Sequence, residues 1–210
     1  HVEDGERTLA LPHEGAVLRC ELDGSGLEIV HRGLRNPQEL AFGDHGDLFT
    51  GDNNSDGGDQ ARWVHVVDGG DSGWTIGFQW LPTRGAWNEE RWWQPRHDEQ
   101  PAFLVPPVRN LAHGPSGLTA YPGTGLPSRY DDMFFLCDFR GGAQHSGVLA
   151  IGLEEDGASF RIAREERFLW HVLATDVEFG IDGGLYVLDW VHGWGLTGRG
   201  RVWRSFDPEL

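Results

Sequence analysis

The sequence predicts an all-β fold built from repeated sheets, of the β-propeller type. The chain contains 31 glycines, and its short alternating apolar runs, separated by Gly/Asp turns, show no sustained helical period. Three segments share one plan: a short strand, a turn, and an apolar strand that closes on an aspartate, at Asp52, Asp138 and Asp189. Asp189 follows Asp138 by 51 residues, and Asp138 follows Asp52 by 86. A period of about 50 residues with several strands per unit is typical of propeller blades.

The longer first interval is one repeat plus an insertion of about 35 residues. The predicted order is the last two strands of an earlier blade, a blade, a Trp-rich insertion, and two further blades, at residues 15–34, 35–72, 73–112, 113–170 and 171–207. This amounts to about three and a half blades, whereas closed rings need at least about four. We therefore expect the 210 residues to be part of a larger propeller.

The insertion holds five of the ten tryptophans. Loops this long are usually functional or disordered, and a high aromatic content argues against disorder. Exposed pairs such as Trp92 and Trp93 could stack on sugar rings. Packing between blades is the alternative for the same residues.

Charge and composition exclude several functions. The formal net charge of −16 argues against nucleic acid as a partner, because phosphate binding needs a positive surface. No apolar run is long enough for a transmembrane helix, and the first residues lack the regions of a signal peptide. There is no lysine, which excludes Schiff-base chemistry. Cys20 and Cys137 lie in apolar runs and are expected to be buried, and their spacing leaves a disulfide open as an alternative.

The loop from Thr50 to Trp63 is a candidate calcium site. Asp52, Asn54, Asp56 and the following glycine match the opening of a calcium loop. The twelfth position is Trp63 instead of a bidentate glutamate, so an EF-hand is not expected. Side chains of Asp52, Asn54, Asp56 or Asp59, or nearby carbonyls, could bind the ion, since close carboxylates repel unless a cation neutralises them. A solvated turn and direct substrate contact remain open alternatives.

The segment "RNPQELAFGDHGDLFTGDNNSDGGDQARWVHVVDGGDSGW", from Arg35 to Trp74, resembles the soluble quinoprotein glucose and sorbosone dehydrogenase family. "GPSGLTAYPGTGLPSRYDDMFFLCDFRG" and "TDVEFGIDGGLYVLDW" resemble two later blades of the same propeller. The similarity spans residues 15–207 and is greatest to the membrane-bound dehydrogenase domain branch of large secreted bacterial proteins. It implies a six-bladed propeller that holds pyrroloquinoline quinone (PQQ) and calcium above its central channel, in a periplasmic or extracellular protein.

The resemblance also implies roles for individual residues. Arg35 and Asn36 would contact the quinone, Arg140 falls near a cationic position of the family, and the carbonyls of Asn54 and Ser55 would bind calcium. A quinone with three carboxylates requires an arginine with its rigid fork of donors. Calcium that bridges the quinone to the protein would polarise the reactive carbonyl.

Two features depart from the family pattern. Quinone-binding members carry an R-x-R-D-V step before the last blade, and this chain has "LATDV", with Leu173 and Thr175 at the arginine positions. The catalytic base histidine of the family lies in an earlier blade, outside this chain. His113, which opens a blade next to the channel, is the remaining candidate.

Two functions follow from these observations. One is part of a quinoprotein-like dehydrogenase that oxidises a sugar or alcohol, binds calcium and passes electrons to a c-type cytochrome. The alternative is a non-catalytic, calcium-stabilised propeller module that binds carbohydrate or protein. "GGDSGW" at Gly69 to Trp74 resembles a serine-protease motif, but the companion histidine motif is absent.

Overall fold

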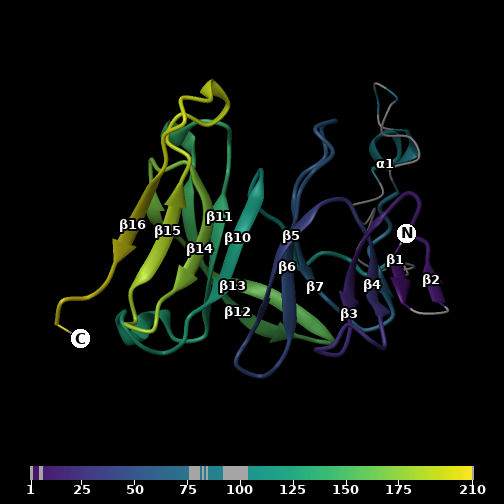
Figure 1. Cartoon of the computed structure of the whole chain (residues 1–210), viewed down its shortest axis with the longest axis horizontal. Coiled ribbons are helices and arrows are strands. Elements are labelled where there is room, and N and C mark those ends of the chain that lie inside the picture. Colours follow the sequence, from purple (N-terminus) through teal and green to yellow (C-terminus); the bar gives the residue numbers. More distant parts are fainter. Residues whose placement is uncertain are drawn as a thin grey trace.

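The computed structural model describes residues 2–4, 7–75, 81, 83, 85–91 and 104–209. These residues form a nearly all-β structure of separate, mostly antiparallel sheets that fan out side by side (Figure 1). The helix α1 (Ala86–Glu89) is one turn long. Within the described residues, no helix has the length and apolar character needed to cross a membrane.

Five sheets are present in the described part of the chain. A small hairpin pairs β1 (Val2–Asp4) with β2 (Arg7–Leu9). The next sheet contains β3 (Gly15–Arg19), β4 (Glu28–Leu34) and β8 (Gly70–Asp71), with β8 parallel to β4. The sheet that we call blade A has the order β5 (Pro37–Phe42), β6 (Leu48–Asp52), β7 (Arg62–His65) and β9 (Arg109–Asn110).

Blade B has the order β10 (Pro115–Ala120), β11 (Met133–Asp138), β12 (Gly147–Asp156) and β13 (Ser159–Trp170). Blade C has the order β14 (Ala174–Phe179), β15 (Leu185–Asp189) and β16 (Arg201–Ser205).

Two short strands depart from the sequence-based boundaries. β8 lies within the segment expected to form one blade, 35–72, but it pairs with β4 of the preceding sheet. β9 lies within the expected insertion, 73–112, but it forms the fourth strand of blade A. Each has only two residues, which is too short for a periodic apolar pattern to appear in the sequence.

Blades A, B and C repeat one hydrogen-bonding plan. The closing aspartate of the second strand is opposite the first residue of the first strand, in the pairs Pro37 with Asp52, Pro115 with Asp138, and Ala174 with Asp189. A register shift follows directly in all three. The amide after each aspartate then donates to the residue that precedes the first strand: Asn53 to Asn36, Phe139 to Gly114, and Trp190 to Leu173. The three aspartate-terminated segments are therefore structurally equivalent, and they lie in separate sheets.

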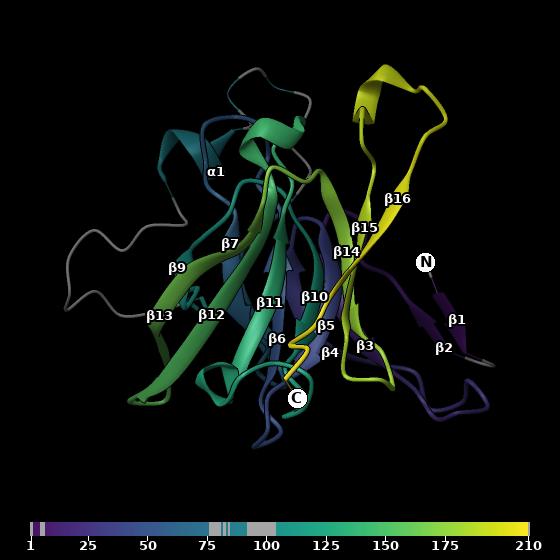
Figure 2. The same ribbon diagram turned by 90° about the vertical axis from the view of Figure 1, so that its left-hand side faces the viewer.

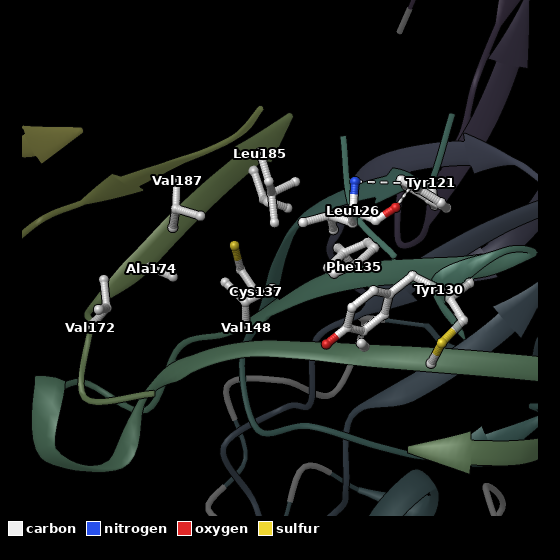
Figure 3. Close-up of a cluster of buried hydrophobic side chains, with 13 residues drawn as sticks. Tyr121, Leu126, Tyr130, Phe135, Cys137, Val148, Val172, Ala174, Leu185 and Val187 are labelled. Atoms are coloured by element: carbon white, nitrogen blue, oxygen red, sulfur yellow. Dashed lines mark hydrogen bonds between the residues drawn. The ribbon is translucent and has the colours of Figure 1, made fainter. Parts of the chain in front are cut away.

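The blades pack face to face through β11. Its run "MFFLCD" is buried at every position. Phe134 and Leu136 join the cluster shared with blade A, whereas Phe135 and Cys137 join the cluster shared with blade C. Figure 3 shows the latter cluster, in which the sulfur of Cys137 points toward Leu185 and Val187 and the ring of Phe135 lies beside Leu126. Because successive side chains point to opposite faces, a strand buried on both sides needs a continuous apolar run.

The two cysteines differ in their surroundings. Cys137 is buried, as expected, and desolvation raises the pKa of its thiol. The prediction for Cys20 was wrong, since it is exposed. It follows β3 directly, where the apolar run has given way to the turn that leads to β4.

Candidate functional site

The equivalent aspartates bring three loops to one end of the fan, which we call the aspartate end. Asp52, Asp138 and Asp189 close β6, β11 and β15 there. The segment that carries α1 and the yellow segment after β15 both lie at this end in Figures 1 and 2, opposite the β5–β6 turn. This end holds most of the residues that the sequence singles out.

Asp52 is directed into the protein. Its carboxylate is 1% exposed and accepts hydrogen bonds from the amides of Arg35, at 2.9 Å, and Asn36, at 2.7 Å. Arg62 forms an ion pair with the same carboxylate at 2.5 Å. All of these are donors, so the charge of Asp52 is already neutralised within the protein.

Arg62 connects three parts of the chain. Besides Asp52, it donates to the carbonyls of Ser72, at 2.7 Å, and Gly33, at 3.2 Å, in the preceding sheet. Its guanidinium also lies 4.9 Å from the ring centroid of Trp87 in α1. The pair of Arg62 and Asp52 therefore holds the base of the acidic loop against the neighbouring sheet.

Asp59 closes the acidic loop on itself. Its carboxylate is 8% exposed and accepts from the amide of Ser55 at 2.8 Å and from the Ser55 hydroxyl at 2.6 Å. Trp87 Nε1 donates to the same carboxylate at 3.0 Å, and Asn88 donates to Ser55 Oγ at 3.0 Å. The loop is thus stabilised by hydrogen bonds between its own residues and α1.

Asn54 and Asp56 form the tip of the loop. Asn54 Oδ1 accepts from the Asp56 amide at 3.2 Å. The Asp56 side chain is 76% exposed and lies 3.7 Å from Arg35 Nη2. No group of three or more His, Cys, Asp or Glu in the described ranges is arranged to hold a metal ion. The side chains therefore do not converge as the calcium-loop pattern predicts, because Asp52 and Asp59 are engaged by protein donors.

Arg35 and His113 occupy equivalent positions in successive blades. Each lies two residues before the proline that begins the blade, and each donates its amide to the closing aspartate, Asp52 or Asp138. The Arg35 side chain is 16% exposed, whereas His113 is exposed. Both residues therefore border the aspartate end.

Arg140 is engaged by its own blade. Its Nε and Nη2 atoms lie 2.7 and 2.6 Å from Asp138 Oδ2, and its amide donates to Ser146 Oγ at 2.8 Å. The guanidinium also lies 5.8 Å from the ring centroid of Trp170. A carboxylate ligand would have to share this arginine with a buried aspartate.

Leu173 and Thr175 are surrounded by groups of blade C and of the loop that follows β15. Leu173 is 1% exposed, and a Cβ atom on Gly193 would lie 2.7 Å from its Cδ2 atom. The Thr175 hydroxyl lies 3.4 Å from the Leu188 carbonyl. At these two positions the chain supplies packing in place of cationic side chains.

An aromatic group lies at the aspartate end. Phe139 and Trp190 directly follow Asp138 and Asp189, and their rings stack with centroids 6.1 Å apart. Trp194 adds an edge contact to Trp190 at 4.9 Å and is 71% exposed. Alignment of the repeats would have placed Phe139 beside Trp190, because both occupy the same step of the blade. Trp92 and Trp93, which the sequence suggests as a sugar-stacking pair, lie outside the described residues.

The motif "GGDSGW" forms a buried polar pair. Ser72 Oγ lies 2.8 Å from His31 Nε2, and the Val67 carbonyl lies 3.0 Å from His31 Nδ1. His31 and Ser72 are 0% and 2% exposed, and burial lowers the pKa of His31. Since neither side chain is accessible to a substrate, the pair stabilises the junction of β4 and β8.

Comparison with solved structures identifies the fold. The chain is similar to an oxidoreductase (glucose dehydrogenase) from Thermus thermophilus, with 24% identity and a TM-score of 0.58, over 84% of this chain and 47% of that one. It is similar to the PQQ-bound aldose sugar dehydrogenase from Streptomyces coelicolor, with 17% identity and a TM-score of 0.55, over 88% and 46%. It is also similar to the apo form of the soluble aldose sugar dehydrogenase from Escherichia coli, with 20% identity and a TM-score of 0.54, over 88% of this chain and 48% of that one.

No protein-family model and no curated protein sequence matches the chain. The chain spans about half the length of the solved structures it matches. Over most of its own length, it therefore has the propeller-type fold of the sugar dehydrogenases of known structure.

Proposed function

We propose that the chain is part of a PQQ-dependent dehydrogenase that oxidises a hydroxyl group of a sugar or alcohol. The observation that carries the proposal is the set of three equivalent blades whose aspartate-terminated strands bring Arg35, His113 and the acidic loop to one end. Similarity to a PQQ-bound sugar dehydrogenase over 88% of the chain supports it. When bound, the quinone would supply the hydride acceptor for the reaction.

Arg35 is the residue best suited to hold the carboxylates of the quinone. Its one ion pair among the described residues is the 3.7 Å contact with the exposed Asp56, which leaves most of its donors for a ligand. Its backbone is fixed by Asp52, as is that of Asn36. Fixing the backbone limits the entropy lost when the side chain binds an anion. Arg140 would make a weaker contact, since Asp138 already engages two nitrogens of its guanidinium group.

Calcium would bind in this loop through the carbonyl oxygens of Asn54 and Ser55. The carboxylates of Asp52 and Asp59 would act indirectly, by holding the two ends of the loop. Calcium accepts backbone carbonyls as ligands, so the engaged carboxylates do not exclude it. Asp56 at the exposed tip would add negative charge near the ion.

The sugar would lie against the aromatic group of Phe139, Trp190 and Trp194. Aromatic faces provide rigid apolar area at low cost in conformational entropy. The proposal places the protein in the periplasm or outside the cell, with a c-type cytochrome as the electron acceptor. The base that removes the hydroxyl proton would come from outside this chain, with His113 as the candidate within it.

Titration of the full-length parent protein with PQQ and calcium tests the proposal. We expect saturable binding at micromolar PQQ and a bound-quinone absorbance band that calcium strengthens. Arg35→Leu should weaken binding about tenfold or more, because a charge-assisted contact to a carboxylate is lost.

Arg19→Leu is the matched control, since Arg19 pairs with Glu28 on the surface of another sheet. Its binding curve should match that of the wild type. Absence of saturable PQQ binding in the wild type would exclude the dehydrogenase function.

A non-catalytic calcium-stabilised module that binds carbohydrate or protein is the second candidate. It is favoured by the buried Leu173 and by the engagement of Arg140 with Asp138. In that case, oligosaccharides or a protein would bind at the aspartate end without PQQ, and Trp194→Ala would remove the binding.

A further inference from the structure

A cavity lies between blades A and B, at the end of the strands opposite the aspartate end. This interblade cleft of about 230 Å³ is formed by the β5–β6 turn, the start of β11 and the hairpin between β12 and β13. Figure 1 shows the β5–β6 turn at the bottom and α1 at the top. The cleft is therefore separate from the aspartate end and plays no part in the function proposed above.

Aromatic rings form the floor of the interblade cleft. Phe49 is 1% exposed and contacts Phe134 and Phe160 edge to face, with centroids 5.1 and 5.2 Å apart. All three rings line the cavity. Such a floor accepts an apolar stem and attracts a cation above a ring face.

Two carboxylates from different blades meet at this cleft. Asp44 comes from the β5–β6 turn and Asp132 from the residue before β11, and both line the cavity. A hydrogen bond to Asp132 is the main cause that raises the pKa of Asp44. Asp132 has a φ of 60°, a left-handed conformation that Asp adopts more readily than most residues. Two carboxyl groups this close favour a bound cation or a shared proton.

The remaining charges leave the cleft anionic. Asp47, Glu154 and Glu155 also line it, and His45 is the one basic side chain among its lining residues. Asp47 is 3.4 Å from His65, and Glu154 pairs with Arg161. The pair of Asp44 and Asp132 has no arginine partner among the described ion pairs.

We propose that the interblade cleft binds an organic monocation, an ammonium or guanidinium group on a short apolar stem. The carboxylates of Asp44 and Asp132 bind the cationic head, and the three phenylalanines contact the stem. The cavity is smaller than the roughly 300–1,000 Å³ of sites for drug-sized ligands. Its occupant is therefore a small amine or guanidine, or a single lysine or arginine side chain of another protein.

Calorimetric titration of the full-length protein, without PQQ, tests the proposal with four probes. These are n-butylammonium, n-butylguanidinium, the neutral n-butanol, and an acetylated, amidated Gly-Lys-Gly peptide. We expect the cations to bind with an affinity that falls as salt is added, because exposed charges are screened. Tighter binding of the peptide identifies a protein side chain as the ligand, and tighter binding of the free amine identifies a small molecule.

The variant Asp44→Asn/Asp132→Asn removes both charges while it keeps the shape of the side chains, and Asn tolerates the conformation of Asp132. Cation affinity should fall about tenfold or more. Asp68→Asn is the control, since it removes one exposed charge outside the cleft, and it should leave affinity within about twofold.

Three outcomes would overturn the proposal: no cation binds, butanol binds as well as butylammonium, or the double variant binds as the wild type does. Thermal unfolding of the variant checks that it is folded. PQQ binding is measured separately on the same samples. A failure at the cleft is thereby distinguished from a failure of the dehydrogenase function.

Discussion

At the scale of single residues, buried charge is concentrated at the pair of Arg62 and Asp52. Their side chains are 4% and 1% exposed, and every partner of Asp52 is a donor. Such a pair adds little net stability compared with apolar residues, but loss of one partner leaves an uncompensated buried charge. Each of the two residues is therefore costly to remove alone.

Arg62→Met should lower the free energy of unfolding by about 3–5 kcal/mol. The variant leaves Asp52 without its cation and the carbonyls of Gly33 and Ser72 without a donor. Urea unfolding measures the change. Adding Asp52→Asn should recover part of the loss, because the remaining group is neutral.

Arg19→Met is the comparison, since the pair of Arg19 and Glu28 is exposed and its loss should leave the urea midpoint unchanged. Additive losses in the double variant would contradict the role assigned to the buried pair.

At the scale of the elements, strands of neighbouring blades approach each other closely at two glycines. A Cβ atom on Gly117 in β10 would lie 2.5 Å from Asp176 Cα in β14, and one on Gly51 in β6 would lie 2.5 Å from Pro115 Cβ. These contacts are between different blades. Glycine is needed here for space, since neither residue has a positive φ.

Gly117→Ala should destabilise the protein by about 1–3 kcal/mol, because the methyl group meets backbone atoms that cannot move without separating blades B and C. Thermal unfolding measures the shift. Gly200→Ala provides the control, as its Cβ atom would be 3.6 Å from its nearest neighbour, the Asp189 carbonyl. Equal midpoints for the two variants would show that the inner strands can separate without cost.

At the scale of the whole molecule, the junction of the blades collects negative charge in a chain of net charge −16. Glu39 of β5 accepts from the Leu118 amide of β10 at 2.6 Å, and Glu178 of β14 accepts from Thr119 at 3.0 Å. Burial raises the pKa of Glu39, followed by the charge of Asp176 and a hydrogen bond with it, and then by the charge of Glu178. The folded state therefore holds a proton on Glu39 more tightly than the unfolded chain does.

The sign of the pH dependence follows from that shift. Glu39 contributes its full stabilisation below the pKa of the unfolded chain and loses it as the pH rises through the higher pKa of the folded state. Glu39→Gln retains an acceptor for Leu118 but does not ionise. Relative to wild type, the variant should gain stability as the pH rises above the pKa of an unperturbed glutamate.

Urea midpoints at several pH values measure this gain, with Glu21→Gln as a control at an exposed carboxylate. If the urea midpoints of the wild type and of Glu39→Gln change in parallel with pH, ionisation of Glu39 does not cost stability and the inference is wrong.

The local sequence was sufficient to predict the repeat. Aspartate-terminated strands at Asp52, Asp138 and Asp189 were predicted as equivalent, and the matching registers confirm that they are. The all-β class was also predicted, because period-two patterns and Gly/Asp turns are local signals. The short β8 and β9 carry no such signal, since their pairing depends on strands far away in the chain.

The candidate site was predicted less well. The repeat is enough to bring Arg35, His113 and the acidic loop to one end of the blades. The sequence does not show that Asp59 closes on Ser55 and Trp87 or that Asp138 engages Arg140. The sequence of an acidic loop suggests a cation site, because it shows the carboxylates but not the donors that engage them.

The sequence by itself determined which strands repeat and where each blade turns. Only the tertiary structure decided which carboxylates are engaged within the protein and which face a cavity, as Asp44 and Asp132 do. The physical reason is the range of the interactions. Strand periodicity and turns depend on neighbours in sequence, whereas the partner of a charged group is fixed by packing between distant segments.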